Sequence, residues 1–344
     1  MFGYVVRRLI GVVIMLLALS LMTFWMFTKA PADPARLMCG KSCTPALVEA
    51  DRKQLGLDQP FWSQYARFLV AMPCGGLYPN EGPILACPVL DNAQTTQTQV
   101  YCSPVSLGYT FRKGECVTTL IVEAFPVTAA LAIGGVILWL ITGIGIGIFA
   151  ALRRGRWQDR ISMGGALIGY SFPSFFIALL LLYFVVLTWH LLPYPKYVPF
   201  SENPAQFFQT FLLPWIAIAI LYAAFYARLT RNQMLETLGE DYIRTARAKG
   251  LRERTVIYKH ALRAGLTPIV TVVGLDFAAL LGGAIIIESV FTLPGIGKLA
   301  LESTLQLDLP IIMATVLLAA FFVILANLVV DILYAAIDPR VRLV

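Results

Sequence analysis

The sequence predicts an all-α polytopic membrane protein with six transmembrane helices and a cysteine-rich extracytoplasmic insertion. Three observations lead to this fold class. The 344 residues are 58% hydrophobic and only 14% charged, with a mean hydropathy of +0.74, which exceeds the values of ordinary soluble domains. Six apolar runs are long enough to cross a bilayer as helices. All six cysteines fall in one segment, between the first two runs.

Each predicted span is a run with the length that a helix needs to cross the hydrocarbon core, about 20 residues. In chain order the runs are Leu9–Thr28, Ala124–Leu152, Ile161–Pro195, Asn203–Ala227, Ala264–Ile287 and Leu309–Val330. Pro173 should kink the third run. The first run is longer than the apolar part of a usual signal peptide, and a poor cleavage site follows it, so we expect a retained helix over residues 1–29.

The basic residues indicate which side of the membrane is cytoplasmic. Arg7 and Arg8 precede the first span, and four arginines lie between 153 and 160, after the second. The stretch 228–263 holds nine Lys or Arg against four acids, whereas the alternate short loops hold one lysine each, Lys196 and Lys298. Because cytoplasmic loops are enriched in Lys and Arg, both termini should be cytoplasmic. The net charge of +7 then reflects topology rather than nucleic-acid binding.

This topology sets the expected domains. An extracytoplasmic loop domain covers residues 30–119, and a transmembrane core covers 120–336 with a cytoplasmic loop at 229–264. A cytoplasmic tail follows at 337–344.

The six cysteines all belong to the extracytoplasmic loop. They are Cys39, Cys43, Cys74, Cys87, Cys102 and Cys116. An even number in one extracytoplasmic segment favours disulfides, in any of fifteen pairings. A zinc site is the alternative, because the spacing of Cys39 and Cys43 permits one, but no second close pair follows and the loop has no histidine.

The outer loop divides into two parts of different character. Residues 51–70 predict an amphipathic helix whose apolar face carries the aromatic residues Phe61, Trp62, Tyr65 and Phe68. Residues 72–105 are rich in Pro, Gly, Asn, Gln and Thr and lack periodicity, so crosslinks would be their main source of order. This second part is either a passive loop or a segment that contacts the substrate.

The cytoplasmic stretch Asp241–Pro268 is basic and amphipathic. Ile243, Ala246 and Gly250 fall on one narrow helical face of small residues, and the cations point elsewhere. Gly250 and Leu251 should interrupt this helix. Such a helix could dock its small-residue face into a groove of a cytoplasmic protein, or it could lie on anionic lipid. The pattern leaves both open.

Residues 242–251, YIRTARAKGL, resemble the EAA loop of ABC importer permeases, in the version of the dipeptide/oligopeptide permease family. Arg244-Thr245-Ala246 occupies the Glu-Ala-Ala position, of which the first two residues depart from the general pattern, and Gly250 matches the family's glycine. In that family the short helix of this loop is the coupling helix, which sits in a groove of the ATPase subunit. The resemblance implies this role for Tyr242, Arg244, Thr245, Ala246, Lys249, Gly250 and Leu251.

Other segments resemble the same family, in the same order along the chain. They are LGLDQP at 55–60, LGYTF at 107–111, ESVFTLPGIG at 288–297, and DILY with DPR between 331 and 340. Residues 72–105 are the departure and look inserted. Cys116 stands where the family often has proline, which implies that the insertion is crosslinked to its base.

The resemblance implies the six-helix fold of ABC type I importers and a permease subunit that forms half of a pathway for di- or oligopeptides. Its partners would be a homologous second permease subunit, two ATP-binding subunits, an extracytoplasmic solute-binding protein and membrane lipid, at the plasma (inner) membrane. ATP and Mg would be bound by the partners, and this chain would hold no cofactor, metal or catalytic residue. Permeases of this family also serve nickel, glutathione and other small solutes, so the cargo stays open.

One short motif could be mistaken for an ATP site. GIGK at 295–298 is no P-loop, because Thr292 stands where the first glycine is required and Leu299 where Ser or Thr is required.

Four residues of the fifth run and the segment after it are predicted for the translocation pathway: Asp276, Glu288, Gly282 and Gly283. A charge near the bilayer centre costs about 2.5–3.5 kcal/mol, so Asp276 should either line the pathway and attract a peptide's ammonium group or form a structural hydrogen bond. Glu288 is open between a gate and a structural role. The glycine pair, like five glycines of the second span at 134, 135, 143, 145 and 147, either packs helices closely or forms a hinge.

Two other classes of protein are distant alternatives. An intramembrane enzyme could use Asp276 and Asp331, but the two histidines, His190 and His260, are too far apart for an H-E-x-x-H zinc site, and no G-x-S-x-G motif occurs. A receptor or scaffold would explain a crosslinked outer loop but not a helix of the coupling type.

Overall fold

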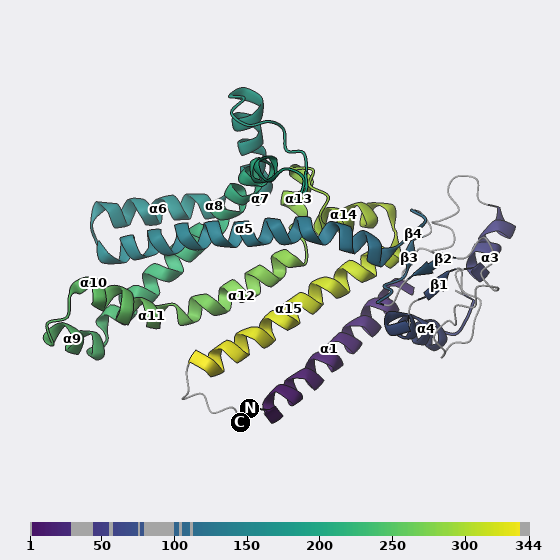
Figure 1. Cartoon of the computed structure of the whole chain (residues 1–344), viewed down its shortest axis with the longest axis horizontal. Coiled ribbons are helices and arrows are strands. Elements are labelled where there is room, and N and C mark those ends of the chain that lie inside the picture. Colours follow the sequence, from purple (N-terminus) through teal and green to yellow (C-terminus); the bar gives the residue numbers. More distant parts are fainter. Residues whose placement is uncertain are drawn as a thin grey trace. The chain divides into compact units, whose positions relative to one another are not determined.

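The computed structural model describes residues 2–28, 44–54, 58–74, 76–78, 100–102, 105–110 and 113–337. These residues are mostly helical (Figure 1) and belong to two compact units. The first unit comprises residues 1–126 and 299–321, and the second comprises residues 127–298 and 322–344. The unit boundaries fall inside three helices, α5 (Val117–Leu152), α14 (Ile296–Gln306) and α15 (Leu309–Ile337).

In the first unit, the amphipathic helix α4 (Phe61–Cys74) packs against helix α1 (Phe2–Thr28). The Tyr65 hydroxyl of α4 lies 2.8 Å from Ser20 Oγ and donates to the Leu17 carbonyl at 3.2 Å. The prediction of one helix over 51–70 is wrong in its extent, because α3 (Pro45–Gln54) is a separate helix and α4 begins after Pro60. The Pro60 carbonyl starts α4 by accepting from the amides of Ser63 and Gln64.

Two short antiparallel hairpins complete the described part of the outer loop. Strand β1 (Gly76–Tyr78) pairs with β2 (Val100–Cys102), and β3 (Tyr109–Thr110) pairs with β4 (Glu115–Cys116). The residues that look inserted therefore leave and return through a paired stem. Beside the second hairpin, Thr110 Oγ1 donates to the buried Asp308 carboxylate at 2.5 Å.

One disulfide falls within the described residues, between Cys102 and Cys116. It joins the stem of the inserted segment to β4, as the resemblance implies for Cys116. Cys39, Cys43 and Cys87 lie outside the described residues, and Cys74 is the last residue of α4. The disulfide-rich character of the whole insertion thus remains a prediction.

The core of the second unit is built on α8 (Pro204–Gly239), which contacts most of the other helices of the unit. Asn203 caps its first turn, because the Asn203 side-chain oxygen accepts from the Gln206 amide at 3.2 Å. Helix α5 lies close to α8 through glycines: a Cβ on Gly143 would come within 2.8 Å of Tyr226 Cβ, and one on Gly147 within 2.7 Å of the Ala227 carbonyl. The packing role predicted for these two glycines is confirmed, whereas Gly145 faces open space.

The third predicted span is broken at Pro173. Helix α6 (Trp157–Ser171) ends before Pro173, and α7 (Ser174–Leu181) continues as the π-helical segment η2 (Leu182–Thr188), at an angle of 99° to α6. Phe172 and Pro173 have extended backbones, with ψ of 138° and 145°. The kink predicted at Pro173 is confirmed and takes the form of a break, because a proline followed by a second helix can redirect the chain completely. The helices on either side of the break form a bent pair that is long and apolar enough to count together as one candidate span.

The fifth predicted span is broken as well, which its hydropathy does not reveal. Helix α12 (Thr267–Leu281) follows α11 (Leu262–Gly265), and α13 (Ile285–Val290) begins after the glycine pair. A bend of 52° separates α12 from the preceding helical segment Glu253–Gly265. The prediction of one continuous helix over 264–287 is therefore wrong, because the helix is interrupted near its start, before Thr267, and near its end, after Leu281.

Among the described residues, three helices are long and apolar enough to cross a membrane, namely Val117–Leu152, Pro204–Gly239 and the part Leu309–Val330 of α15. The two bent pairs bring this number to five if each pair counts as one span, and Ile10–Met26 of α1 is a shorter apolar helix. The architecture is thus a helical membrane protein with three to five candidate spans.

Candidate functional site

The stretch that resembles a coupling helix forms a short, sharply bounded helix, α9 (Asp241–Ala248), directly after α8. Glu240 separates the two helices with an extended backbone, and its carbonyl accepts from the amides of Ile243 and Arg244. Gly250 ends the turn in the left-handed region, with φ of +73°, and its amide donates to the Arg247 carbonyl at 2.9 Å. The predicted interruption at Gly250 is confirmed.

The small-residue face of α9 points into the chain itself. Ile243 is fully buried and Ala246 is 7% exposed. They pack with residues from the end of α5, from α8 and from the segment after α9. That segment includes α10 (Glu253–Thr255) and η3 (Val256–Ala261). The residues packed with Ile243 and Ala246 are Ile148, Ala151, Met234, Val256, Ile257 and Ala261. We call this group the α9 cluster.

The orientation of α9 shows which of its faces a partner could reach. The sequence pattern leaves docking into a protein groove and lying on anionic lipid open, and in the structure the face of Ile243 and Ala246 is occupied by the α9 cluster. The other residues of α9 are exposed, with 45% of Tyr242 accessible, and so is Leu251 after the end of the helix, with 41% accessible. Of the seven predicted coupling residues, Ala246 alone is buried, and the exposed six are Tyr242, Arg244, Thr245, Lys249, Gly250 and Leu251.

Polar contacts fasten the exposed side of α9 to the chain that follows it. Arg247 donates to Glu253 through two nitrogens, at 2.8 and 3.3 Å, across the turn at Gly250. This hydrogen bond raises the pKa of the Arg247 guanidinium, so its charge is permanent. Burial raises the pKa of the Tyr242 hydroxyl, which stays protonated and available as a donor. The α9 cluster packs the other side of α9 against the ends of α5 and α8.

A second link on α8 escaped the sequence analysis. Arg231 donates to Asp159 at the start of α6 through Nε at 2.6 Å and through a terminal nitrogen at 2.8 Å. Asp159 is 4% exposed and also accepts from the Gly155 amide at 3.0 Å. The sequence did contain a signal for this pair, since Asp159 is the one acid among the four arginines at 153–160. The sequence analysis counted only the basic residues of this segment and did not consider a partner for the acid.

Asp276 lies on α12 and contacts a cluster of three aromatic residues of the second unit, Tyr226, Trp139 and Tyr222, through the Tyr226 hydroxyl. The Tyr226 hydroxyl donates to Asp276 Oδ2 at 2.7 Å. The Tyr226 ring stacks near the fully buried Trp139, with centroids 5.9 Å apart, and Trp139 stacks on Tyr222 at 4.4 Å. The Asp276 side chain is partly exposed, so one carboxylate oxygen is fixed by the structure while the group keeps access to its surroundings.

Glu288 is fully buried, unlike Asp276, and is enclosed by donors. It accepts from Thr128 Oγ1 at 2.8 Å, the Lys298 amide at 2.9 Å and the Ala284 amide at 3.3 Å. Thr128 Oγ1 in turn accepts from the Ile296 amide at 2.9 Å. This geometry favours the structural role for Glu288 over the gate.

The predicted glycine pair lies at the break between α12 and α13. Gly282 caps α12 in a helical conformation. Gly283 has φ of +120°, and a Cβ there would lie 2.7 Å from the backbone of Gly297. Only glycine fits such a close approach between two backbones. The pair therefore forms the break itself.

Within the described part of the chain, no three His, Cys, Asp or Glu side chains gather in a way that could hold a metal ion.

Two family profiles match the chain in succession. "Binding-prot-dependent transport system membrane comp, N-term" matches residues 1–132, and "Binding-protein-dependent transport system inner membrane component" matches residues 143–343. Together they cover α9, both broken spans and the outer loop.

Full-length relatives agree with the profiles. A peptide transport system permease protein of Brucella abortus (strain 2308) is 35% identical over 344 residues, with 99% of each chain covered. A glutathione transport system permease of Escherichia coli (strain K12) is 37% identical with the same coverage.

A solved structure shares the fold. An inward-facing structure of the MetNI methionine ABC transporter matches with a TM-score of 0.53 and 17% sequence identity, over 64% of this chain and 97% of the other. The match in fold agrees with the family profiles and the relatives. The chain belongs to the family of binding-protein-dependent transport system inner membrane components and is a permease subunit of an ABC importer, not a hydrolytic enzyme on its own.

Proposed function

We propose that this subunit forms half of a pathway for di- or oligopeptides and receives its motion through the exposed face of α9. The observation that carries the proposal is the fixation of α9 on one side by the α9 cluster, with Tyr242, Thr245 and Leu251 exposed on the other. A helix held in this way acts as a rigid extension of α8. Closure of the ATP-binding subunits would displace α9 and α8 together, which is a rigid-body route between inward- and outward-facing states.

The partners follow from this role. Two ATP-binding subunits would hold ATP and Mg and receive α9, a homologous second permease would supply the other half of the pathway, and an extracytoplasmic solute-binding protein would deliver cargo. Membrane lipid would surround the spans.

We propose six spans, which are the three long helices, the two bent pairs and α1, with both termini cytoplasmic. The ion pair between Asp159 and Arg231 supports this topology, because it joins the first turn of α6 to the last third of α8, and the positive-inside rule places the basic segments beside these two residues on the same side.

The charge of Asp276 favours peptide over glutathione as cargo. A carboxylate at membrane depth attracts the free ammonium group that both ligands carry, but it repels the second carboxylate of glutathione, which a peptide without acidic side chains lacks. Glutathione, nickel or another small solute remains the alternative cargo. Uptake of labelled peptides and of labelled glutathione by the reconstituted importer would separate them, and transport of glutathione alone would contradict the peptide proposal.

We also propose disulfides for the remaining extracytoplasmic cysteines, Cys39, Cys43, Cys74 and Cys87. Their even number and the link between Cys102 and Cys116 support this. Mass spectrometry of a digest of the unreduced protein would identify the pairs, and alkylation of all four without reduction would contradict them.

Substitution of Gly250 tests the coupling role. Gly250→Trp places a large side chain beside the exposed face of α9, and nothing lies within 4 Å of its Cβ to clash with inside the chain. We expect transport-linked ATPase activity to be lost while membrane insertion remains intact.

Gly155→Trp is the matched control. Gly155 also has a left-handed backbone, with φ of +78° against +73° for Gly250, and its Cβ would also meet open space. Both substitutions therefore carry the same backbone penalty of about 1–2 kcal/mol, but Gly155 lies in the turn between α5 and α6. The docking of α9 would be contradicted if both variants lost the same share of ATPase activity, or if neither variant lost any.

A further inference from the structure

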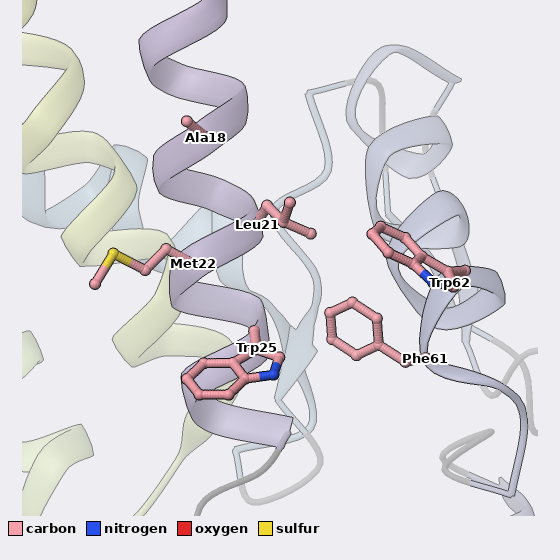
Figure 2. Close-up of a pocket in the computed structure, with 6 residues that line it drawn as sticks. All are labelled: Ala18, Leu21, Met22, Trp25, Phe61 and Trp62. Carbon is pink, nitrogen blue, oxygen red and sulfur yellow. The ribbon is translucent and has the colours of Figure 1, made fainter.

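A groove of about 520 Å³ lies between α1 and α4 in the first unit (Figure 2). Ala18, Leu21, Met22 and Trp25 of α1 and Phe61 and Trp62 of α4 line it. All of these side chains are apolar or aromatic. Leu21 points from α1 toward α4, and Phe61 projects from α4 toward α1 (Figure 2).

The span proposed above for α1 would place the groove at the level of the hydrocarbon core. Its four α1 residues all fall within the apolar part of that helix, Ile10–Met26. Ala18 precedes the end of α1 at Thr28 by ten residues, which at the rise of an α-helix corresponds to a depth of about 15 Å. This depth is half of a hydrocarbon core of about 30 Å, so the groove extends from the middle of the bilayer toward one interface.

Several polar side chains beside the groove have hydrogen-bond partners within the protein. Ser20 Oγ and Tyr65 Oη lie 2.8 Å apart, and Thr23 Oγ1 donates to the Leu19 carbonyl at 2.7 Å. On α4, the side chain of Ser63 donates to the Pro60 carbonyl at 2.7 Å, and that of Gln64 donates to a carbonyl five residues earlier at 2.8 Å. Internal pairing of this kind is what hydrocarbon requires of polar groups.

Aromatic contacts hold α4 in place, so the groove is preformed. The ring of Phe24 lies 5.6 Å from Phe61, 5.5 Å from Tyr65 and 5.8 Å from Phe68, between centroids. Trp25 and Trp62 remain 57% and 67% exposed. Indole rings are enriched at the interfaces of membranes, where they contact both acyl chains and headgroups.

We infer that this groove binds one acyl chain of a phospholipid. A chain entering from the bilayer would reach Ala18 and would be flanked by the two indoles. The volume is within the range of about 300–1,000 Å³ typical of ligand sites, and no charged side chain lines it that a polar ligand could use. The inference rests on the span proposed for α1, and the proposed topology places this lipid in the outer leaflet. The binding itself does not depend on which end of α1 is cytoplasmic or on transport.

Native mass spectrometry of the purified importer complex tests the site. Ala18→Phe should fill the floor of the groove and reduce the tightly bound phospholipids by one per complex, and Leu21→Trp provides a second blocking variant. Ile14→Phe is the matched control, because Ile14 is 60% exposed on the same helix and does not line the groove. An unchanged number of lipids in both blocking variants, in complexes that assemble normally, would overturn the inference.

Tryptophan fluorescence identifies the source of the ligand. In complexes reconstituted with phospholipids brominated in the middle of their acyl chains, Trp62→Phe should remove a larger share of the quenched emission than Trp189→Phe, which changes an exposed indole outside the groove. Quenching of Trp62 by aqueous iodide instead would show that the groove faces water. Quenching by bromine that occurs in the isolated subunit and disappears in the complex would assign the groove to the second permease. Either result would overturn lipid binding.

Discussion

The second unit contains two buried carboxylates whose charges are stabilised in different ways. Asp159, at the start of α6, faces the Arg231 guanidinium through two hydrogen bonds of 2.6 and 2.8 Å. Glu288, in α13, is held by the Thr128 hydroxyl and by the amides of Ala284 and Lys298. The first arrangement depends on a long side chain from another helix, and the second depends mainly on backbone from the same segment.

This difference indicates different tasks. The ion pair joins α6 to α8, and α9 follows α8 directly, so the pair contributes to the packing of these helices against one another. The amides around Glu288 belong to a chain that turns twice within fifteen residues, between Ala284 and Lys298. Glu288 therefore fixes the shape of the break, and its loss should change the local structure more than the helix packing.

The ion pair should show the largest effect on stability. Arg231→Met leaves Asp159 buried without its cation, and loss of one partner of a buried pair costs about 3–5 kcal/mol. The lower end applies, since the Arg231 side chain is 21% exposed. We expect a clear decrease in the thermal midpoint of the purified complex. The double variant Asp159→Asn with Arg231→Met removes both charges and should recover most of the loss; no recovery would mean that Arg231 acts through packing.

Glu288 should show an intermediate effect. Glu288→Gln replaces an acceptor-only group with an amide that directs two N–H donors toward other donors, and an unsatisfied buried donor costs about 1–3 kcal/mol. Limited proteolysis between α12 and α14 should become faster. Thr128→Val removes one of the bonds and should produce a smaller change of the same kind. A loss of stability larger than that of Arg231→Met would contradict the contrast between the two carboxylates.

The contact between α5 and α8 should show a smaller effect. A methyl group on Gly147 would lie 2.5 Å from Thr230 Cβ and 2.7 Å from the Ala227 carbonyl, whereas one on Gly145 meets nothing within 4 Å. We expect Gly147→Ala to lower the free energy of unfolding by about 1 kcal/mol through overpacking. Gly145→Ala should raise it by up to about 1 kcal/mol, because alanine has the higher helix propensity. Thermal midpoints of the two variants that do not differ would contradict close packing at Gly147.

The sequence allowed much of this architecture to be predicted, because strong local signals decide it. Long apolar runs predicted where helices lie, Pro173 predicted the first break, and Gly250 predicted the end of α9. Each of these signals acts through a few neighbouring residues, so the tertiary structure does not override it.

The remaining features depend on contacts between distant residues. The break at Gly282 and Gly283 is invisible to hydropathy, because glycine and alanine continue an apolar run. The orientation of α9 could not be predicted from the sequence pattern, since a small-residue face can pack against the chain's own helices as well as against a partner. The pair of Asp159 and Arg231 required a contact across 72 positions of the chain.

Asp276 should have the smallest effect on stability and the clearest effect on transport. An asparagine can still accept from the Tyr226 hydroxyl, which now donates to Asp276 at 2.7 Å, so we expect Asp276→Asn to change the thermal midpoint little. If Asp276 binds a peptide's ammonium group, its charge contributes about 1.5–3 kcal/mol to that hydrogen bond, and KM for cationic peptides should rise about tenfold or more, with a smaller change for acidic ones. Uptake of neutral and cationic peptides that stays unchanged would leave Asp276 with only its structural bond. This variant completes the comparison, because a carboxylate kept partly accessible at membrane depth is expected to serve a ligand rather than the fold.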